Sequence, residues 1–388
     1  MKYWRGYIVA GLCVALTLAL MAFAASHTAL VDMVYPYTTR LIQSSLAEWT
    51  AGADFCLWQL IVVVLGVVGL ASIAVMIVVR WNFFQWLGWV LAICCFLFMM
   101  HTGIYGLNSH AGPLAEDIRL EEADFNVTEL VEATNYYMQI ANELATQVPR
   151  NADGTPNYPS FQELAEMAGE GFDYLAYEKY YAVFAGCTLP VKELGWADMY
   201  TSMGITGVSM PLTGEAAVNP QIPVVSLPFT MCHEMCHRIC IAQERDANLG
   251  AFLACDAHSD PIYRYSGYFM AFRYCYNALV SVGSATASSA ASQIYSQIGP
   301  EMKQDLTQYR DFFNAHRDET ASNVANSAND AYIKVSGDES GVQSYSEVSN
   351  LLVSWYIQEI YLPAHQEEVD TFDPMDKTQV DLHQNAGG

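Results

Sequence analysis

Three long runs of apolar residues near the N-terminus constrain this chain more than any other feature. They cover residues 7–25, 57–79 and 83–100, and none contains Asp, Glu, Lys or Arg. Each is close to the roughly 20 residues that cross the hydrocarbon core of a bilayer. Aromatic residues of the kind found at membrane surfaces lie near their ends: Trp4, Trp58, Trp81, Trp86 and Tyr105. The sequence therefore predicts three transmembrane helices, with three helices buried in a soluble core as the alternative.

The charges predict which side of the membrane each part occupies. Lys2 and Arg5 precede the first run and Arg80 lies between the second and third, and basic residues favour the cytoplasmic side. Everything after residue 100 is then expected outside the cytoplasm, as part of a multi-pass protein of the cell membrane. Residues 106–388 hold 13 basic and 38 acidic residues, a net charge of −25, which argues against nucleic acid as a partner. Because AFAAS near residue 24 resembles a signal-peptidase site, removal of the first run remains an alternative.

The rest of the chain has the pattern of a mainly helical domain with a small sheet, an α+β fold. Helical spacing of apolar residues begins near Asn126 or Thr128 and recurs over residues 161–184. Short runs with Gly, Pro and Val between residues 205 and 225 indicate strands, and helix returns from residue 229. We expect a membrane region over residues 1–105, an outer domain over 106–365 and a disordered acidic tail over 366–388.

The stretch FTMCHEMCHRIC, residues 229–240, contains the residues that indicate a metal site. On a helix His233 and His237 lie one turn apart on one face, so both can bind one metal ion, and Glu234 stands beside them. This is the spacing with which metallopeptidases bind zinc and supply a general base. The alternative is a buried helix whose two histidines are satisfied by hydrogen bonds.

A catalytic zinc ion has three protein ligands and an open position, so a third ligand is needed. Glu244 is the first choice and Asp246 the second. On one straight helix Glu244 would lie about 10 Å beyond His237, out of reach, so the chain must turn between residues 238 and 243. Asn248 would then follow Glu244 by one turn and could orient a ligand histidine. His258 is a further alternative ligand.

The motif region resembles a known family. HEMCHRICIAQERDAN, the downstream DPIYRYSGYFMAFRYCYNAL and the three-span start are similar to a bacterial family of membrane-anchored HExxH proteins catalogued as domain of unknown function 3810. The motif is also similar to that of gluzincin metallopeptidases. That resemblance implies a zincin-like outer domain, with His233, His237 and Glu244 as zinc ligands, Glu234 as base and Asn248 behind them. The sequence departs from the family at Cys240, where a glycine is usual.

Other residues are weaker candidates for the site. Arg264 or Tyr265 could stabilise an oxyanion, with a core position as the alternative. GVSM, residues 207–210, could form an edge strand that pairs with an extended peptide, and Glu215 and Asn219 could line the cleft or lie on the surface. The stripe of Cys232, Cys236 and Cys240 is expected to pack in the interior, a disulfide to Cys187, Cys255 or Cys275 being the alternative.

Together these features predict a membrane-anchored zinc-dependent metallopeptidase, a hydrolase whose partners are a peptide or protein substrate and the lipid bilayer. Glu234 would act as general base on zinc-bound water. The rival is a non-catalytic membrane-anchored binding or signalling protein that retains a metal site.

Overall fold

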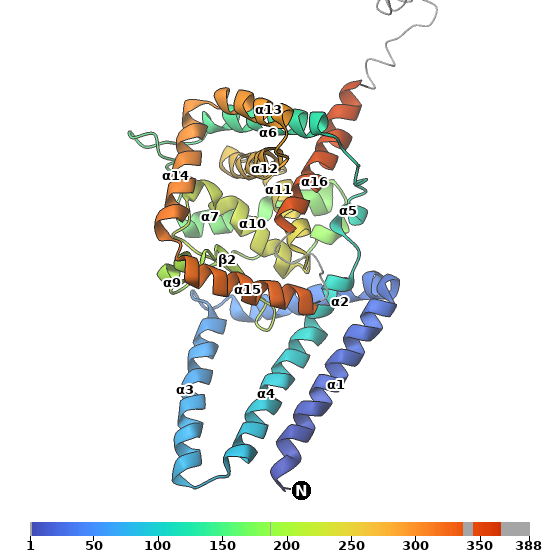
Figure 1. Ribbon diagram of the computed structural model, residues 1–388, viewed down its shortest axis with the longest axis vertical. Helices are drawn as coiled ribbons and strands as arrows, with labels where there is room; N and C mark the ends of the chain where they lie inside the picture. Colours follow the sequence, from blue (N-terminus) through green and yellow to red (C-terminus); the bar gives the residue numbers. More distant parts are fainter. Residues whose placement is uncertain (1, 187, 337–343, 366–388) are drawn as a thin grey trace, which may run out of the picture.

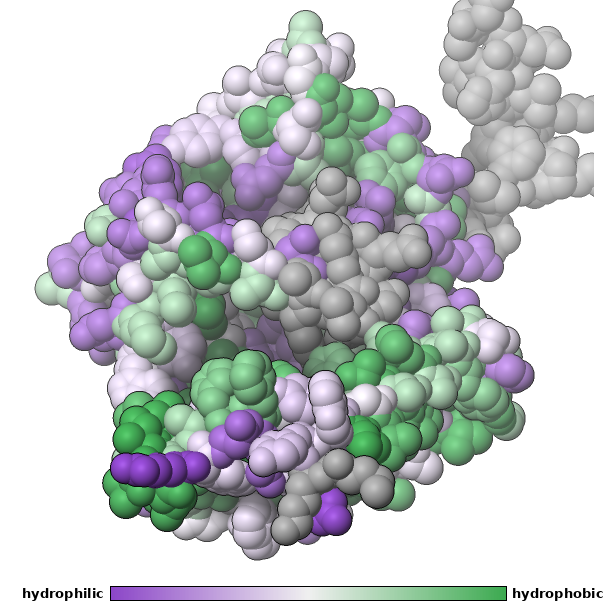
Figure 2. Space-filling model, turned by 60° about the horizontal axis from the view of Figure 1, so that its bottom comes forward, coloured by the Kyte–Doolittle hydropathy of each residue, from purple (hydrophilic) through white to green (hydrophobic). Residues whose placement is uncertain are grey.

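The membrane region contains three long apolar helices. The computed structural model describes residues 2–186, 188–336 and 344–365. In it α1 (Arg5–Ser26), α3 (Leu57–Val78) and α4 (Phe83–Ile104) are each long and apolar enough to cross a membrane, as predicted. They extend from one end of a helical outer domain (Figure 1). In Figure 2 the molecule is turned so that the ends of these helices that lie away from the domain come forward. Hydrophobic residues gather in the lower part of this view and hydrophilic ones in the upper part.

The helices differ in how they pack. α1 and α4 lie against each other, and their backbones approach so closely at Gly6 and Gly88 that a Cβ at Gly6 would collide with the backbone of Gly88. Small residues allow such an approach between membrane helices. The most apolar window of α3 has no buried residue, so this helix stands apart from the pair (Figure 1).

A fourth N-terminal helix, α2 (Thr28–Thr50), follows α1 after the single residue His27. It runs across the base of the outer domain, roughly perpendicular to the three spans (Figure 1). Its moderate hydropathy and exposed polar residues distinguish it from α1, α3 and α4. The sequence patterns described above do not predict this helix.

The outer domain is built around a bundle of helices. α6 (Val127–Ala145), α10 (Leu227–Arg238), α11 (Glu244–Asp256), α12 (Pro261–Ser281) and α16 (Ser344–Tyr356) pack together. Large side chains that are fully buried, among them Tyr137, Phe172, Phe252 and Phe269, fill the core. Further helices surround the bundle: η2 (Gly106–His110), α5 (Leu114–Asp117), α7 (Phe161–Met167), α8 (Gly169–Asp173), α9 (Ala197–Met203), α13 (Ala285–Ser296), α14 (Pro300–His316) and α15 (Glu319–Ser336).

The helix starts follow local sequence signals. Asn126 caps α6 and Glu129 returns a bond to its backbone, and Ser160 with Glu163 does the same for α7. The start near Asn126 is therefore confirmed. The helix expected over residues 161–184 is largely present: α7 and α8 continue into the π-helical turn η3 (Tyr174–Glu178), and a 3-10 turn, η4 (Ala182–Phe184), follows after a short break. α8 carries Gly171, where a Cβ would collide with the backbone carbonyl of Ala254 on α11.

The small sheet has three strands in the order β1–β3–β2. β2 (Gly207–Met210) runs antiparallel to β3 (Glu215–Val218), with Gly207 opposite Val218, and β1 (Lys192–Glu193) is parallel to β3. The strands expected between residues 205 and 225 are thus confirmed. β3 is buried, whereas β2 is a half-buried edge strand.

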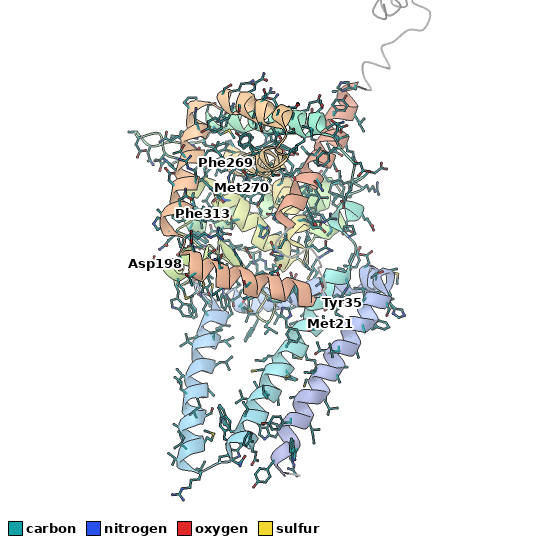
Figure 3. The ribbon with its side chains drawn as sticks, viewed as in Figure 1. Met21, Tyr35, Asp198, Phe269, Met270 and Phe313 are labelled. Carbon is teal, nitrogen blue, oxygen red and sulfur yellow. The ribbon has the colours of Figure 1, made fainter. Side chains whose placement is uncertain are left out.

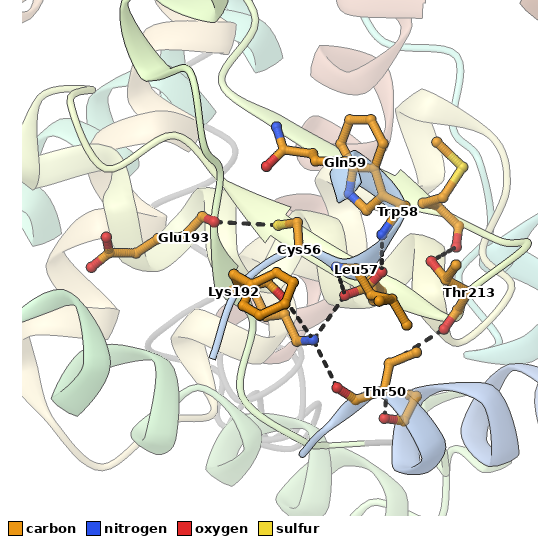
Figure 4. Close-up of polar contacts among 12 residues, drawn as sticks. Thr50, Cys56, Leu57, Trp58, Gln59, Lys192, Glu193 and Thr213 are labelled. Atoms are coloured by element: carbon orange, nitrogen blue, oxygen red, sulfur yellow. Dashed lines mark hydrogen bonds and ion pairs between the residues drawn. The ribbon is translucent and has the colours of Figure 1, made fainter. Parts of the chain in front are cut away.

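Glu215 ties the sheet to the start of helix α3, where Figure 4 shows Leu57, Trp58 and Lys192 close together. Its buried carboxylate accepts hydrogen bonds from the backbone N–H of Leu57 at 2.7 Å and of Trp58 at 2.9 Å, and Lys192 Nζ lies 2.8 Å away. These N–H groups have no partner within the helix, and the carboxylate complements the helix dipole. Glu215 therefore lines neither the cleft nor the surface. Asn219 is also buried, with its amide donating to Thr201 at 2.8 Å.

Candidate metal centre

The metal motif lies on α10, whose two ends are held by the surrounding fold. Pro228 occupies the first turn, where its missing N–H costs nothing, and the N–H of Phe229 donates to Ser266 Oγ of α12 at 3.0 Å. The helix ends at Arg238 and α11 begins at Glu244. The predicted chain reversal is thus confirmed, and it returns Glu244 to the first helix.

The reversal passes through an unfavourable backbone conformation at Cys240, whose φ is +74°. This is the left-handed region that glycine adopts without a Cβ penalty. Cys240, where the family usually has a glycine, is therefore the residue whose backbone conformation favours glycine.

We expect Cys240→Gly to be more stable than Cys240→Ala by about 1 kcal/mol, the usual cost of a Cβ in this conformation. Both variants lose the thiol and differ only at the Cβ, so the comparison isolates the backbone. Chemical denaturation of the two variants measures it, and equal midpoints would show that the turn carries no such strain.

Two imidazoles and one carboxylate converge after the reversal. His233 Nε2 lies 3.3 Å from Glu244 Oε2, and His237 Nε2 lies 3.6 Å from Glu244 Oε1. One ligand atom from each residue falls within 4.8 Å of the other two. The two ring centroids are 4.7 Å apart, and both Nε2 atoms face the Glu244 carboxylate. This group, His233, His237 and Glu244, could hold a metal ion.

The hydrogen bonding of His237 fits a metal ligand. Its Nδ1 lies 2.9 Å from the carbonyl oxygen of Ile241, and since a carbonyl only accepts, Nδ1 carries the proton. In the neutral ring Nε2 then presents a lone pair toward the Glu244 carboxylate. A cation between these two electron-rich atoms, either a proton or a divalent metal ion, would remove their repulsion.

The pKa values of His233, His237 and Glu244 depend on one another. Burial opposes ionisation of Glu244, but the hydrogen bond from His233 and the two imidazoles lower its pKa to about 2. Burial lowers the pKa of His237, whereas for His233 the carboxylate of Glu244 outweighs burial and raises the pKa. A metal ion would take the place of the protons that otherwise balance the carboxylate.

Glu234 faces the same hollow as the metal group. Its side chain is 4% exposed and lies against β2, where a Cβ on Gly207 would collide with its carboxylate. Burial raises the pKa of Glu234 to about 8. The hollow has a volume of about 510 Å³ and is lined by Glu234, the metal group and β2.

A second hollow of about 700 Å³ adjoins the first. Both are lined by Gly204, Thr206, His233 and Asn326, so His233 stands at their junction. Ala325 and Asn326 belong to α15, which packs against α9 and η2 and runs along the membrane-facing side of the domain (Figure 1). Together the hollows form a cleft on both sides of the metal group.

Asn248 lies one turn after Glu244 on α11. Its amide donates to the backbone oxygen of Glu244 at 2.8 Å, and it accepts a hydrogen bond from Tyr274 at 2.9 Å. Tyr274 lines the larger hollow. This tyrosine is not among the residues predicted from the sequence. The signal that could have found it is the run of Arg273, Tyr274, Tyr276 and Asn277, which follows the mainly apolar stretch of residues 265–272.

Tyr265 and Arg264 do not lie at the metal group. The Tyr265 hydroxyl donates to the buried Asp305 carboxylate at 2.6 Å, and the side chain is 0% exposed. Asp305 in turn pairs with Arg150 at 2.7 Å. Neither Tyr265 nor Arg264 lines either hollow. This placement replaces the expectation that one of them stabilises an oxyanion: the tyrosine belongs to the core.

The two alternative ligands, Asp246 and His258, make contacts away from the metal group. Asp246 accepts the backbone N–H of Leu114 at 2.9 Å and so caps α5. His258 stacks on Tyr263 at 4.1 Å and lies 3.1 Å from the carbonyl oxygen of Met167. Glu244 is therefore the carboxylate that reaches the histidines.

The cysteines of the outer domain are in the interior. Cys232, Cys236, Cys240, Cys255 and Cys275 are free and buried, and the Cys232 and Cys255 sulfurs lie 3.8 Å apart without a bond. The expectation that Cys232, Cys236 and Cys240 pack in the interior is confirmed. Cys187 and the predicted tail over residues 366–388 lie outside the described residues.

The sequence matches one protein-family model. The family model described as Protein of unknown function (DUF3810) matches residues 31–353, more than half of the sequence. The chain belongs to the DUF3810 family. The matched part of this DUF3810 protein begins within α2 and includes α3, α4 and the metal group, and α1 precedes it. No curated protein and no solved structure matches.

Proposed function

We propose that this DUF3810 protein is a membrane-anchored, zinc-dependent metallopeptidase whose outer domain faces the extracytoplasmic side. The observation that supports it most is the convergence of His233, His237 and Glu244 beside the buried Glu234. Two imidazoles and a carboxylate are a donor set of catalytic zinc sites, whereas structural zinc sites use four protein ligands. Among the residues that the structure describes, no fourth His, Cys, Asp or Glu joins the group.

Each part of the cleft has a role in peptide hydrolysis. Zinc, when bound, would act as a Lewis acid toward the scissile carbonyl and the attacking water. Glu234 would accept the water's proton and pass it to the leaving amine. The edge strand β2 lines the hollow beside Glu234, so an extended peptide could pair with its backbone in the manner of an added strand.

The test uses the full-length protein purified in detergent. We expect about one zinc ion per chain, cleavage of members of a random peptide library, loss of cleavage with a chelator and recovery with added zinc. Zinc retained by a well-folded protein that cleaves no library member would overturn the proposal and favour a binding protein.

Gly207→Ala provides a geometric test of the role of Glu234. The added methyl group would displace the Glu234 carboxylate, and a misplacement of about 1 Å can cost a hundredfold in rate. We expect peptide cleavage to fall by about that factor with zinc content unchanged. Gly103→Ala is the control, because nothing lies within 4 Å of the Cβ it adds. Equal activity of the two variants would contradict the proposed position of the base.

A further inference from the structure

We propose that α2 lies in the outer interface of the bilayer and thereby holds the metal cleft at the membrane surface, so that the substrates are peptide segments next to a membrane anchor. The location of α2 is independent of the peptidase proposal. The substrate class rests on that proposal.

The first observation is an exposed apolar face on α2. Seven large apolar side chains project from it: Leu30, Met33, Val34, Tyr37, Leu41, Ile42 and Trp49. Leu41 is 71% exposed and Trp49 is 73% exposed. Their spacing of three and four residues places most of them on one side of the helix. Exposure of this face to water would be unfavourable, because burial of each such side chain contributes about 1.5–3 kcal/mol of favourable free energy.

The opposite face of α2 is bound to the outer domain. Arg40 Nε donates to the carbonyl oxygen of Ile239 at 3.0 Å, inside the turn that returns Glu244 to the metal group. Gln43 donates to the carbonyl oxygen of Pro211 at 3.1 Å, just after β2. The domain therefore covers one side of α2, and the apolar side points away from the domain.

Continuity with the membrane spans identifies the bilayer as what covers this face. One residue separates α2 from α1, and α3 begins at Leu57, soon after α2 ends. In the first half of α2, the Tyr35 hydroxyl donates to the carbonyl oxygen of Thr102, near the end of α4, at 2.9 Å. Figure 3 labels Tyr35 at this contact between α2 and the membrane spans. Tied to the ends of all three spans, α2 lies at the depth where amphipathic helices enter the interface.

The charge of α2 indicates the kind of lipid contact. Arg40 is buried against the domain, Asp32 accepts the N–H of Gly112 at 2.9 Å, and Glu48 is exposed. The exposed face thus carries no basic residue, so attraction to anionic lipid does not hold it in place. Insertion should occur in neutral vesicles.

The cleft opens at the same height. The hollow that contains Glu234 and the metal group is also lined by His101, Tyr105, Gly106 and Ser109, from the end of α4 and the turn after it. A membrane helix thus forms part of the wall of the cleft where it leaves the bilayer. A peptide anchored in the same membrane by a short tether is confined to the thin layer in which the cleft lies, so its local concentration at the cleft exceeds that of the same peptide free in solution.

Tryptophan quenching tests the location of α2 without any activity. The full-length protein is placed in phosphatidylcholine vesicles with a nitroxide either near the headgroup or at the end of the acyl chain. The contribution of Trp49 is the difference between wild type and Trp49→Phe. We expect it to be quenched most by the nitroxide near the headgroup. Quenching only by a water-soluble quencher, or by neither, would overturn the bilayer contact, and the second result would indicate a covering protein.

Matched substrates test the substrate class. One random peptide library is presented in three forms: free in solution, linked by a short spacer to a transmembrane anchor in the same vesicles, and linked to that anchor by a long rigid spacer. We expect the short-spacer form to be cleaved at least about tenfold faster than the other two at equal concentration. Leu41→Glu should reduce this preference and leave cleavage of the free peptides intact, with Leu41→Met as its control.

The outcomes separate the two proposals. Equal cleavage of all three forms would overturn the substrate class but leave the peptidase standing. Cleavage of none would overturn the peptidase, and the Trp49 result would still decide where α2 lies.

Discussion

Glu234→Gln is expected to bind as much zinc as the wild type and to hydrolyse peptides about 10²–10⁴-fold more slowly, the contribution typical of a general base. The carboxylate lies in the hollow with His233, His237 and Glu244 but is not a member of the metal group. The amide keeps the size and loses only the ability to accept the proton. Metal analysis and the rate of library cleavage measure the two properties separately.

His233→Ala is the matched comparison, because it removes a ligand and should lose zinc and hydrolysis together. The thermal midpoint of Glu234→Gln should not fall, since burial raises the pKa of the carboxylate and so disfavours its charged form. Hydrolysis by Glu234→Gln at the wild-type rate would exclude Glu234 as the base.

Glu244→Ala is expected to weaken zinc binding by more than about a hundredfold, beyond the effect of losing a residue that only supports a ligand. Its carboxylate is the one that reaches both histidines, at 3.3 and 3.6 Å. A competition titration with a zinc-binding dye gives the affinity of the full-length protein.

Asp246→Ala is the control for this loss. It lies two residues away and caps α5 through Leu114, so we expect reduced stability of the fold with zinc stoichiometry retained. Loss of zinc from Asp246→Ala but not from Glu244→Ala would reverse the ligand assignment.

The elements that could be predicted are those whose signals lie in neighbouring residues. The three spans follow from uninterrupted apolar length, and the start of α6 follows from the pairing of Asn126 with Glu129. The reversal after Arg238 follows from the need for a third metal ligand, because a straight helix would carry Glu244 out of reach of the ion bound by His237.

Tyr265 shows where such reasoning stops. The sequence pointed to α12, but Tyr265 and Tyr274 are nine residues apart, which on a helix places them on roughly opposite faces. Tyr274 lines the cleft, whereas Tyr265 is held by Asp305, forty residues away in the chain. Nothing in the local sequence around Tyr265 indicates that partner.

The amphipathic helix α2 was missed for a related reason. Its apolar face has the spacing of a helix, but the segment is too polar for a span and contains Pro36. Its role depends on which side the outer domain covers, and that is decided by distant contacts such as Arg40 with Ile239.

The sequence by itself determined the apolar spans, the mainly helical character and the pair of histidines one helical turn apart, since length, periodicity and fixed spacing are local properties of the chain. Only the tertiary structure decided that Glu244 and not Asp246 completes the metal group, that Glu215 caps a membrane helix and that α2 presents an apolar face. Each of these depends on which buried polar group finds which partner, and in this fold the partners come from residues far apart in the sequence.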